Sequence, residues 1–274
     1  MYLKKLTLTG LIVILGVLFS STAVYACHPW INVNKYSLSE EGTIRFHIAT
    51  GHRYPFGHSF YSNDNIKKMY ILTSEGKRCE LVPRDLGKGE ISQVQYESKK
   101  KMMPGTHILV MEGKGSFGAE TSDGYKRKSK ADLKGEKIKG KVSFSRNFCK
   151  AVVNIEGKSN GKSYSSILGH PLEIVPLKDP AELRAGDFLP VKILHNGKIL
   201  EDSVMVYATY MGFSTAPDVF AYNSRASYKK GGIAEIKILK PGIWMIFVSH
   251  KLPYPNAKLA DEYSYQSTLT FEVK

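Results

Sequence analysis

Apolar and polar residues alternate in short runs along most of this chain. In GTIRFHIAT, at residues 42–50, every second residue from Ile44 to Ile48 is apolar. Comparable runs occupy residues 68–74, 91–97 and 106–113, and a longer one occupies residues 141–157. Alternation with a period of two is typical of strands with one buried face, and the period of an amphipathic helix is nearly absent. We therefore predict antiparallel sheet throughout the first half.

The second half continues the pattern and adds clear turn signals. Asn196-Gly197 separates two apolar runs, as in a tight hairpin turn of the primed type. KPG, at residues 240–242, separates two more, with a proline that sets one backbone angle and a glycine that frees the next. We predict an all-β protein with two tandem immunoglobulin-like or transthyretin-like β-sandwich domains, at residues 27–166 and 167–274.

The N-terminus has the three parts of a secretory signal peptide. A pair of lysines precedes the apolar stretch LIVILGVLF, and small residues follow up to Ala26. We predict that residues 1–26 are removed by cleavage between Ala26 and Cys27, and that the protein is exported, with a periplasmic location. The alternative is a lipoprotein anchored through a lipidated Cys27, although the tyrosine of VYAC fits the lipobox pattern poorly.

Basic residues give the chain a formal net charge of +14 at pH 7 and concentrate in YKRKSKADLKGEKIKGK, at residues 125–141. One interpretation is peripheral association of this basic loop with an anionic membrane surface. The other is a solvated loop without a partner. Because no aromatic residue interleaves the lysines, as base stacking requires, we expect no nucleic-acid partner.

Two cysteines, Cys79 and Cys149, lie well inside the chain. An oxidising compartment would let them form a disulfide, but their separation does not follow from the sequence, so both states remain open.

Motifs of common enzyme classes are absent from the sequence. It has no glycine-rich phosphate loop, no Gly-x-Ser-x-Gly elbow, no His-Glu-x-x-His helix and no Cys-x-x-Cys pair. We therefore predict a binding protein without catalytic residues.

Histidines are the candidate functional residues, and the chain has eight of them. A neutral imidazole is the commonest protein ligand for transition metals such as nickel, cobalt, copper and zinc. His52 and His58 flank RYPFG, whose proline and glycine favour a loop that brings both rings together. His28 follows the predicted cut, and His250 ends the apolar run WMIFVSH. We predict a metal site with these ligands: His28, His52, His58, His250 and, as a fifth, Cys27.

Each histidine also has a structural alternative. His52 and His58 could belong to a hydrogen-bonded loop. The remaining four are expected to be structural residues of strands or turns: His47, His107, His170 and His195.

Cleavage before Cys27 would change the chemistry of the new N-terminus. An amide nitrogen would become an α-amine with an ordinary pKa near 8, next to the Cys27 thiol and the His28 imidazole. Because all these groups must shed protons to bind a metal, we expect the affinity to fall between about pH 7 and pH 5.

Several motifs together indicate a family. His28-Pro29-Trp30 follows the predicted cut, and GHRYP occupies residues 51–55. The second half contains GHPLEIVPLKDPAELRAGD, VKILHNGKIL, KPGIWMIFVSH and YSYQSTLTFEV. With these motifs the chain resembles a bacterial family of exported domains of poorly defined function, catalogued as a nickel-uptake, substrate-specific region. The resemblance implies His28, His52 and His250 as motif positions, whereas His58 comes from the local pattern alone.

The chain departs from this family at residues 227–232. Relatives often have an Asp-x-x-Gly turn there, whereas this chain has SYKKGG, which argues against an acidic cation loop in the second half.

The function predicted from these observations is transition-metal binding in the periplasm, with nickel or cobalt favoured over copper or zinc, in support of a membrane metal transporter. The alternative is an envelope adhesion or scaffold protein whose histidines are structural. A third candidate, a copper oxidase with an N-terminal histidine brace, requires His28 as the first residue, and Cys27 argues against it.

Overall fold

The computed structural model describes residues 27–85, 94–157 and 161–274. Within these ranges the regular structure consists of strands and short 3-10 helices, so the predicted all-β, sandwich-like class is confirmed. The predicted signal peptide, residues 1–26, lies outside the described residues. No helix in the described ranges is long and apolar enough to cross a membrane.

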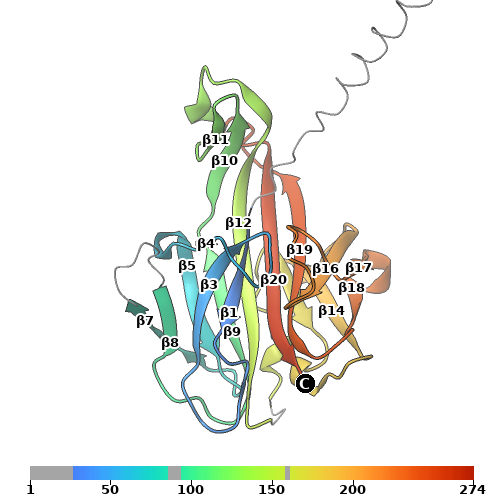
Figure 1. Ribbon diagram of the computed structural model, residues 1–274. Helices are drawn as coiled ribbons and strands as arrows, with labels where there is room; N and C mark the ends of the chain where they lie inside the picture. The colour runs from blue at the N-terminus through green and yellow to red at the C-terminus, as the bar shows by residue number, and fades with distance from the viewer. Residues whose placement is uncertain (1–26, 86–93, 158–160) are drawn as a thin grey trace, which may run out of the picture.

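A large central sheet runs through the whole molecule (Figure 1). In spatial order its main strands are β17 (Tyr222–Ala226), β16 (Val204–Tyr210), β19 (Gly242–Pro253), β20 (Glu262–Val273), β12 (Ile138–Ile155), β9 (Gly105–Gly113), β5 (Ile66–Leu72) and β6 (Arg78–Cys79). Attached to these are β2 (Ser37–Leu38), β10 (Ser116–Thr121) and β11 (Gly124–Lys126). The 3-10 helices are η1 (Asn63–Asn65), η2 (Lys130–Leu133), η3 (Ser163–Ser165), η4 (Pro180–Glu182) and η5 (Tyr228–Lys230).

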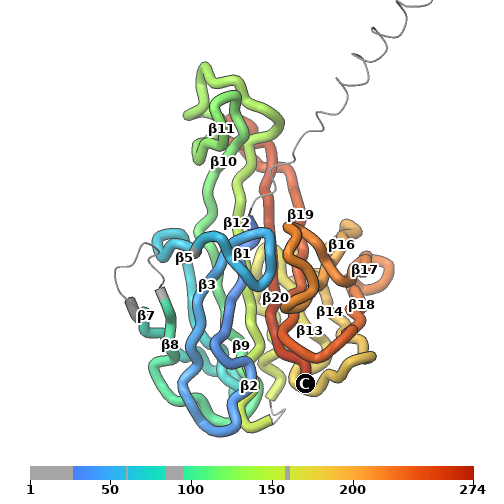
Figure 2. Tube along the Cα trace, viewed as in Figure 1, coloured from blue at the N-terminus to red at the C-terminus, as the bar shows by residue number. Residues whose placement is uncertain are grey.

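Two smaller sheets cover opposite faces of the central sheet (Figure 2). One contains β1 (His28–Val33), β3 (Arg45–Gly51), β4 (Ser59–Phe60), β7 (Leu81–Asp85) and β8 (Val94–Ser98). The other contains β13 (Glu173–Pro176), β14 (Phe188–His195), β15 (Lys198–Ile199) and β18 (Ile233–Lys237). In β12, Ala151 and Val153 pack in the core of the first sheet, whereas Val152 packs in the core of the second. Alternation along one strand thus supplies two cores.

Burial follows the predicted pattern where one face of a strand is covered. In β3, Phe46 and Ile48 are buried, Arg45 is exposed and His47 is intermediate. By contrast, every residue of β9 is buried, because this strand is covered on both faces. The predicted hairpin turn joins β14 to β15, with φ of 50° at Asn196 and 77° at Gly197, as the primed turn requires.

The two halves of the chain share the central sheet. β12 pairs in parallel with β20, from Ser143 opposite Glu262 to Ala151 opposite Thr270. The proposed division into residues 27–166 and 167–274 stays a prediction, and strands from both sides of that boundary pair within one sheet.

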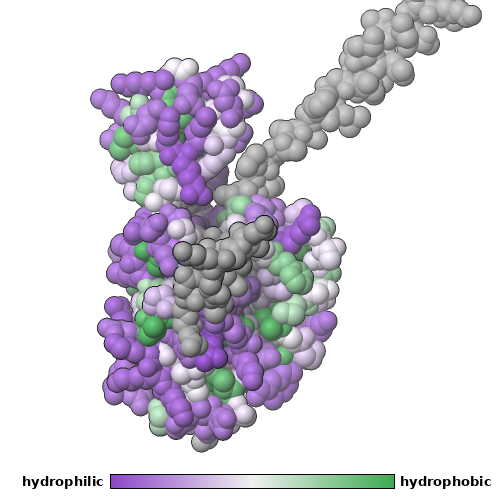
Figure 3. Space-filling model, turned by 60° about the vertical axis from the view of Figure 1, so that its left-hand side comes forward, coloured by the Kyte–Doolittle hydropathy of each residue, from purple (hydrophilic) through white to green (hydrophobic). Residues whose placement is uncertain are grey.

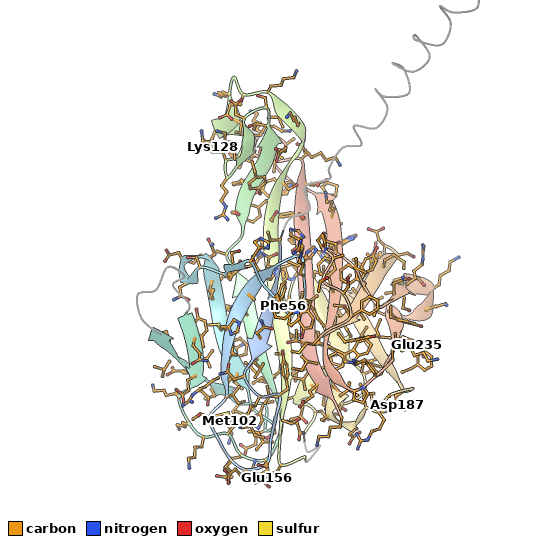
Figure 4. The ribbon with its side chains drawn as sticks, viewed as in Figure 1. Phe56, Met102, Lys128, Glu156, Asp187 and Glu235 are labelled. Atoms are coloured by element: carbon orange, nitrogen blue, oxygen red, sulfur yellow. The ribbon has the colours of Figure 1, made fainter. Side chains whose placement is uncertain are left out.

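The basic segment forms an ordered protrusion (Figures 1 and 3). The protrusion consists of β10, β11, η2 and the start of β12, and its surface in Figure 3 is mostly hydrophilic. Lys130 pairs with Asp261 and Lys141 with Glu262. Arg127 and Lys128 are exposed, and Lys128, near the tip in Figure 4, lies 3.5 Å from Glu136. The structure thus gives the segment a defined fold, and a partner for it stays a prediction.

Cys79 and Cys149 are free thiols. They lie on β6 and β12, with β5 and β9 between them, so the strand spacing alone separates them by about 14 Å. That separation is too large for a disulfide.

Candidate metal centre

His28 is the first residue of β1. Side chains of the central sheet fix the position of this strand through hydrogen bonds to its backbone carbonyls. The Cys149 thiol and the Thr268 hydroxyl donate to the Pro29 carbonyl, at 3.3 and 2.9 Å, and Thr270 donates to the Ile31 carbonyl at 2.9 Å. The His28 ring packs on Phe247 of β19, with ring centroids 4.1 Å apart. Only 7% of the His28 surface is exposed, and the residue lies at the end of the sheet that contains β1 and β3.

The loop after β3 brings His52 and His58 together, as the sequence predicted. The chain folds back at Gly57, and the His58 amide donates to the Thr50 carbonyl at 3.0 Å. A Cβ at Gly57 would lie 2.8 Å from the Ala49 Cβ, so this close return needs glycine. The rings of His52 and His58 stack with centroids 5.8 Å apart.

Asp218 joins this group from the other half of the chain, in the segment between β16 and β17. Its amide donates to the His52 carbonyl at 2.8 Å, and its φ of 54° lies in the left-handed region, which Asp tolerates better than most residues. Its carboxylate oxygens both lie 3.1 Å from His52 Nδ1, and Oδ1 lies 3.3 Å from His28 Nε2.

These three side chains fit a transition-metal ion. One ligand atom from each of His28, His52 and Asp218 lies within 4.8 Å of the others. Because metal bonds to imidazole nitrogen and carboxylate oxygen are about 2.1 Å long, ligand atoms on one ion lie about 3–4 Å apart, so small side-chain movements suffice. His28 presents Nε2 to the Asp218 carboxylate, and its Nδ1 is buried on the other side of the ring.

Cys27 and His58 form a second pair beside this cluster. Cys27 Sγ lies 3.3 Å from His58 Nε2, and both residues are exposed. His52 connects the pairs, since its ring is 5.5 Å from that of His28 and 5.8 Å from that of His58. A soft sulfur and a third imidazole are therefore next to the two histidines and the carboxylate. Phe56, labelled in Figure 4, is an exposed residue of the same loop.

Burial lowers the pKa of His28, and the nearby Asp218 carboxylate opposes this shift. Because a metal binds the neutral imidazole, a lowered pKa keeps His28 ready as a ligand over a wider pH range.

His250 lies apart from this cluster. It shares a face of β19 with Ile246 and Val248, whereas Phe247, which contacts His28, points to the opposite face. His250 Nε2 instead lies 3.4 Å from Asp202. The structure thus brings together four of the predicted ligands, and does not bring His250 to them.

The sequence reasoning missed Asp218. This residue precedes the SYKKGG segment that argued against an acidic loop in the second half, and its contact with His52 spans 166 residues. Its local signal is weak, because an aspartate in a polar, proline-containing loop is ordinary turn chemistry.

The fold and the site together define an all-β, sandwich-like protein with a cluster of histidine and aspartate side chains at one end of its first sheet. The chain belongs to the family described as Domain of unknown function (DUF4198), whose model matches residues 24–252, a range that includes every residue of the cluster. Membership of a family of unknown function is thereby confirmed, and a link to nickel uptake stays a proposal. No curated protein matches the chain.

Proposed function

We propose that this protein is an exported, periplasmic metal-binding protein that takes up nickel or cobalt as cargo and supports a membrane metal transporter. The observation that carries the proposal is the convergence of His28, His52 and Asp218 within 4.8 Å, beside Cys27 and His58. Imidazole, carboxylate and thiolate together suit nickel, cobalt, copper or zinc better than magnesium or calcium.

Isothermal titration calorimetry tests the proposal. The mature protein, starting at Cys27, is titrated with Ni²⁺ and Co²⁺, and with Zn²⁺ and Cu²⁺ for comparison. We expect micromolar or tighter binding, and a loss of affinity in His52→Ala because this ring contacts Asp218 and stacks near His58. His250→Ala, outside the cluster, is the matched variant that should bind normally. Absence of nickel and cobalt binding in the micromolar range would sink the proposal.

The role of the N-terminus has its own test. An extra Gly-Ser before Cys27 converts its α-amine to an amide, which is a poor ligand near neutral pH. If the amine binds the ion, this extension weakens binding, and the affinity of the mature form falls from about pH 7 to pH 5 as the ligands gain protons. An unchanged affinity in the extended protein would exclude the amine as a ligand.

Envelope scaffolding is the second candidate function, and the ordered basic protrusion favours it. Sedimentation with vesicles of phosphatidylglycerol and phosphatidylcholine tests it. We expect membrane binding that weakens with salt and is lost when Arg127 and Lys128 are changed to glutamate. Equal sedimentation of wild type and variant would exclude this surface.

A further inference from the structure

A cavity of about 490 Å³ opens beside β6, in the first half of the chain. Its walls come from the turn between β5 and β6, from β6 itself and from the segment between β8 and β9. Met102, one of its lining residues, is labelled in Figure 4, lower in that view than Phe56 beside the candidate metal centre. The volume falls within the range of small-molecule sites.

His107 holds the two walls of the cavity in place. Its Nδ1 accepts a hydrogen bond from the Ser74 amide at 3.2 Å, and its Nε2 lies 2.8 Å from the Met103 carbonyl, to which it donates. The Met102 amide also donates to the Gly42 carbonyl at 2.8 Å. Because these bonds involve buried groups and backbone, the cavity is preformed.

Cationic side chains surround the opening. Five of them line it: Lys77, Arg78, Lys99, Lys100 and Lys101. Lys77 pairs with Glu75 at 2.9 Å and Lys99 with Glu80 at 3.0 Å. Across the described ranges of the chain, no carboxylate forms an ion pair with Arg78, Lys100 or Lys101. The rim therefore has an excess of positive charge.

The deeper lining is apolar and contains sulfur. Met102 and Cys79 are buried, and Met103, which also lines the cavity, is 54% exposed. Methionine side chains adapt to the shape of an apolar ligand. A second metal site does not fit here, because both His107 ring nitrogens are hydrogen-bonded and the Cys79 thiol donates to the Glu80 carbonyl at 3.4 Å.

We propose that this cavity binds an organic anion with a hydrocarbon portion. Lys100 and Lys101 hold the anionic group at the rim, and the hydrocarbon lies against Met102, Met103 and Cys79. Arg78 adds positive charge nearby, with its guanidinium 4.4 Å over the Tyr70 ring. The site is independent of the metal centre.

The test uses the mature protein labelled at the methionine methyl groups, titrated with octyl phosphate, inorganic phosphate and octanol at constant ionic strength. We expect octyl phosphate to bind at least tenfold more tightly than either other probe and to shift the methyl signals of Met102 and Met103. Equal binding of octyl phosphate and inorganic phosphate, or unshifted methyl signals, would overturn the proposal.

Charge reversal supplies the matched variants. Lys100→Glu combined with Lys101→Glu should weaken octyl phosphate binding at least tenfold, whereas Lys229→Glu combined with Lys230→Glu, at an exposed lysine pair outside the cavity, should not. An equal loss in both double variants would contradict the assignment. Phosphatidylglycerol vesicles identify the source of the anion: sedimentation that depends on Lys100 and Lys101 indicates a lipid headgroup, and octyl phosphate binding without sedimentation indicates a soluble anion.

Discussion

The carboxylate of Asp218 contacts both His28 and His52, so its charge matters for any cation held between them. Asp218→Asn keeps the size of the side chain and removes the charge. We expect nickel affinity, measured by calorimetry, to fall at least about tenfold, since even residues behind metal ligands typically contribute 10–100-fold.

Asp202 offers a matched control for this substitution. It faces His250 at 3.4 Å in a comparable histidine–aspartate pair outside the cluster. Asp202→Asn should leave nickel affinity unchanged. A similar loss in both variants would mean that general electrostatics, and not coordination, determines the binding.

His170 makes stability depend on pH. Burial, reinforced by the charge of Lys150, lowers its pKa to about 4. In the unfolded chain the pKa is about 6.5, so between these values the unfolded state binds the proton more readily. The free energy of unfolding contributed by this group therefore falls as the pH drops from 6.5 to 4, by about 3 kcal/mol in total. Urea unfolding at several pH values measures this loss, which should be smaller in His170→Gln; an identical loss would contradict the assignment.

At the scale of elements, the return of the chain from β3 to β4 depends on Gly57. In Gly57→Ala the new methyl group would lie 2.8 Å from the Ala49 Cβ and 3.1 Å from the Thr50 amide nitrogen, so the loop must shift and carry His58 with it. We expect weaker metal binding by calorimetry and a stability loss of about 1–3 kcal/mol. Gly42→Ala is the control, because its nearest contact would be an ordinary 3.5 Å. Unaltered binding in Gly57→Ala would show that the position of His58 is unimportant.

The sequence predicted the elements better than the site. Alternation identified β3, and Asn196-Gly197 identified the turn between β14 and β15, because both signals are local. His52 and His58 also met through a local loop. Asp218 could not be found this way, since a tertiary contact brings it to His52. The side to which His250 points depends on how β19 lies between two layers, which a single strand pattern does not reveal.

For the whole molecule, the candidate centre joins the two halves of the chain, because His28 and His52 come from the first and Asp218 from the second. An ion bound only by the folded state stabilises it by about 2.7 kcal/mol at a hundred times its dissociation constant. Calorimetric unfolding with and without Ni²⁺ should show one transition, because the central sheet is shared, and a higher Tm with the metal. The rise should vanish in Asp218→Asn. Two separate transitions, or a rise that persists in the variant, would contradict this picture.

The position of β20 has a consequence for the order of folding. This strand follows β12 and β19 in the chain and lies between them in the sheet, and its Thr268 and Thr270 hydrogen-bond to β1 near the start of the described chain. Until residues 262–273 emerge, β12 and β19 each have an open edge, and such edges promote aggregation. Contacts this distant in sequence also form slowly. Nascent chains therefore cannot complete the central sheet until residues 262–273 have been made, and in an exported protein, as proposed here, the sheet would be completed after the chain has crossed the membrane.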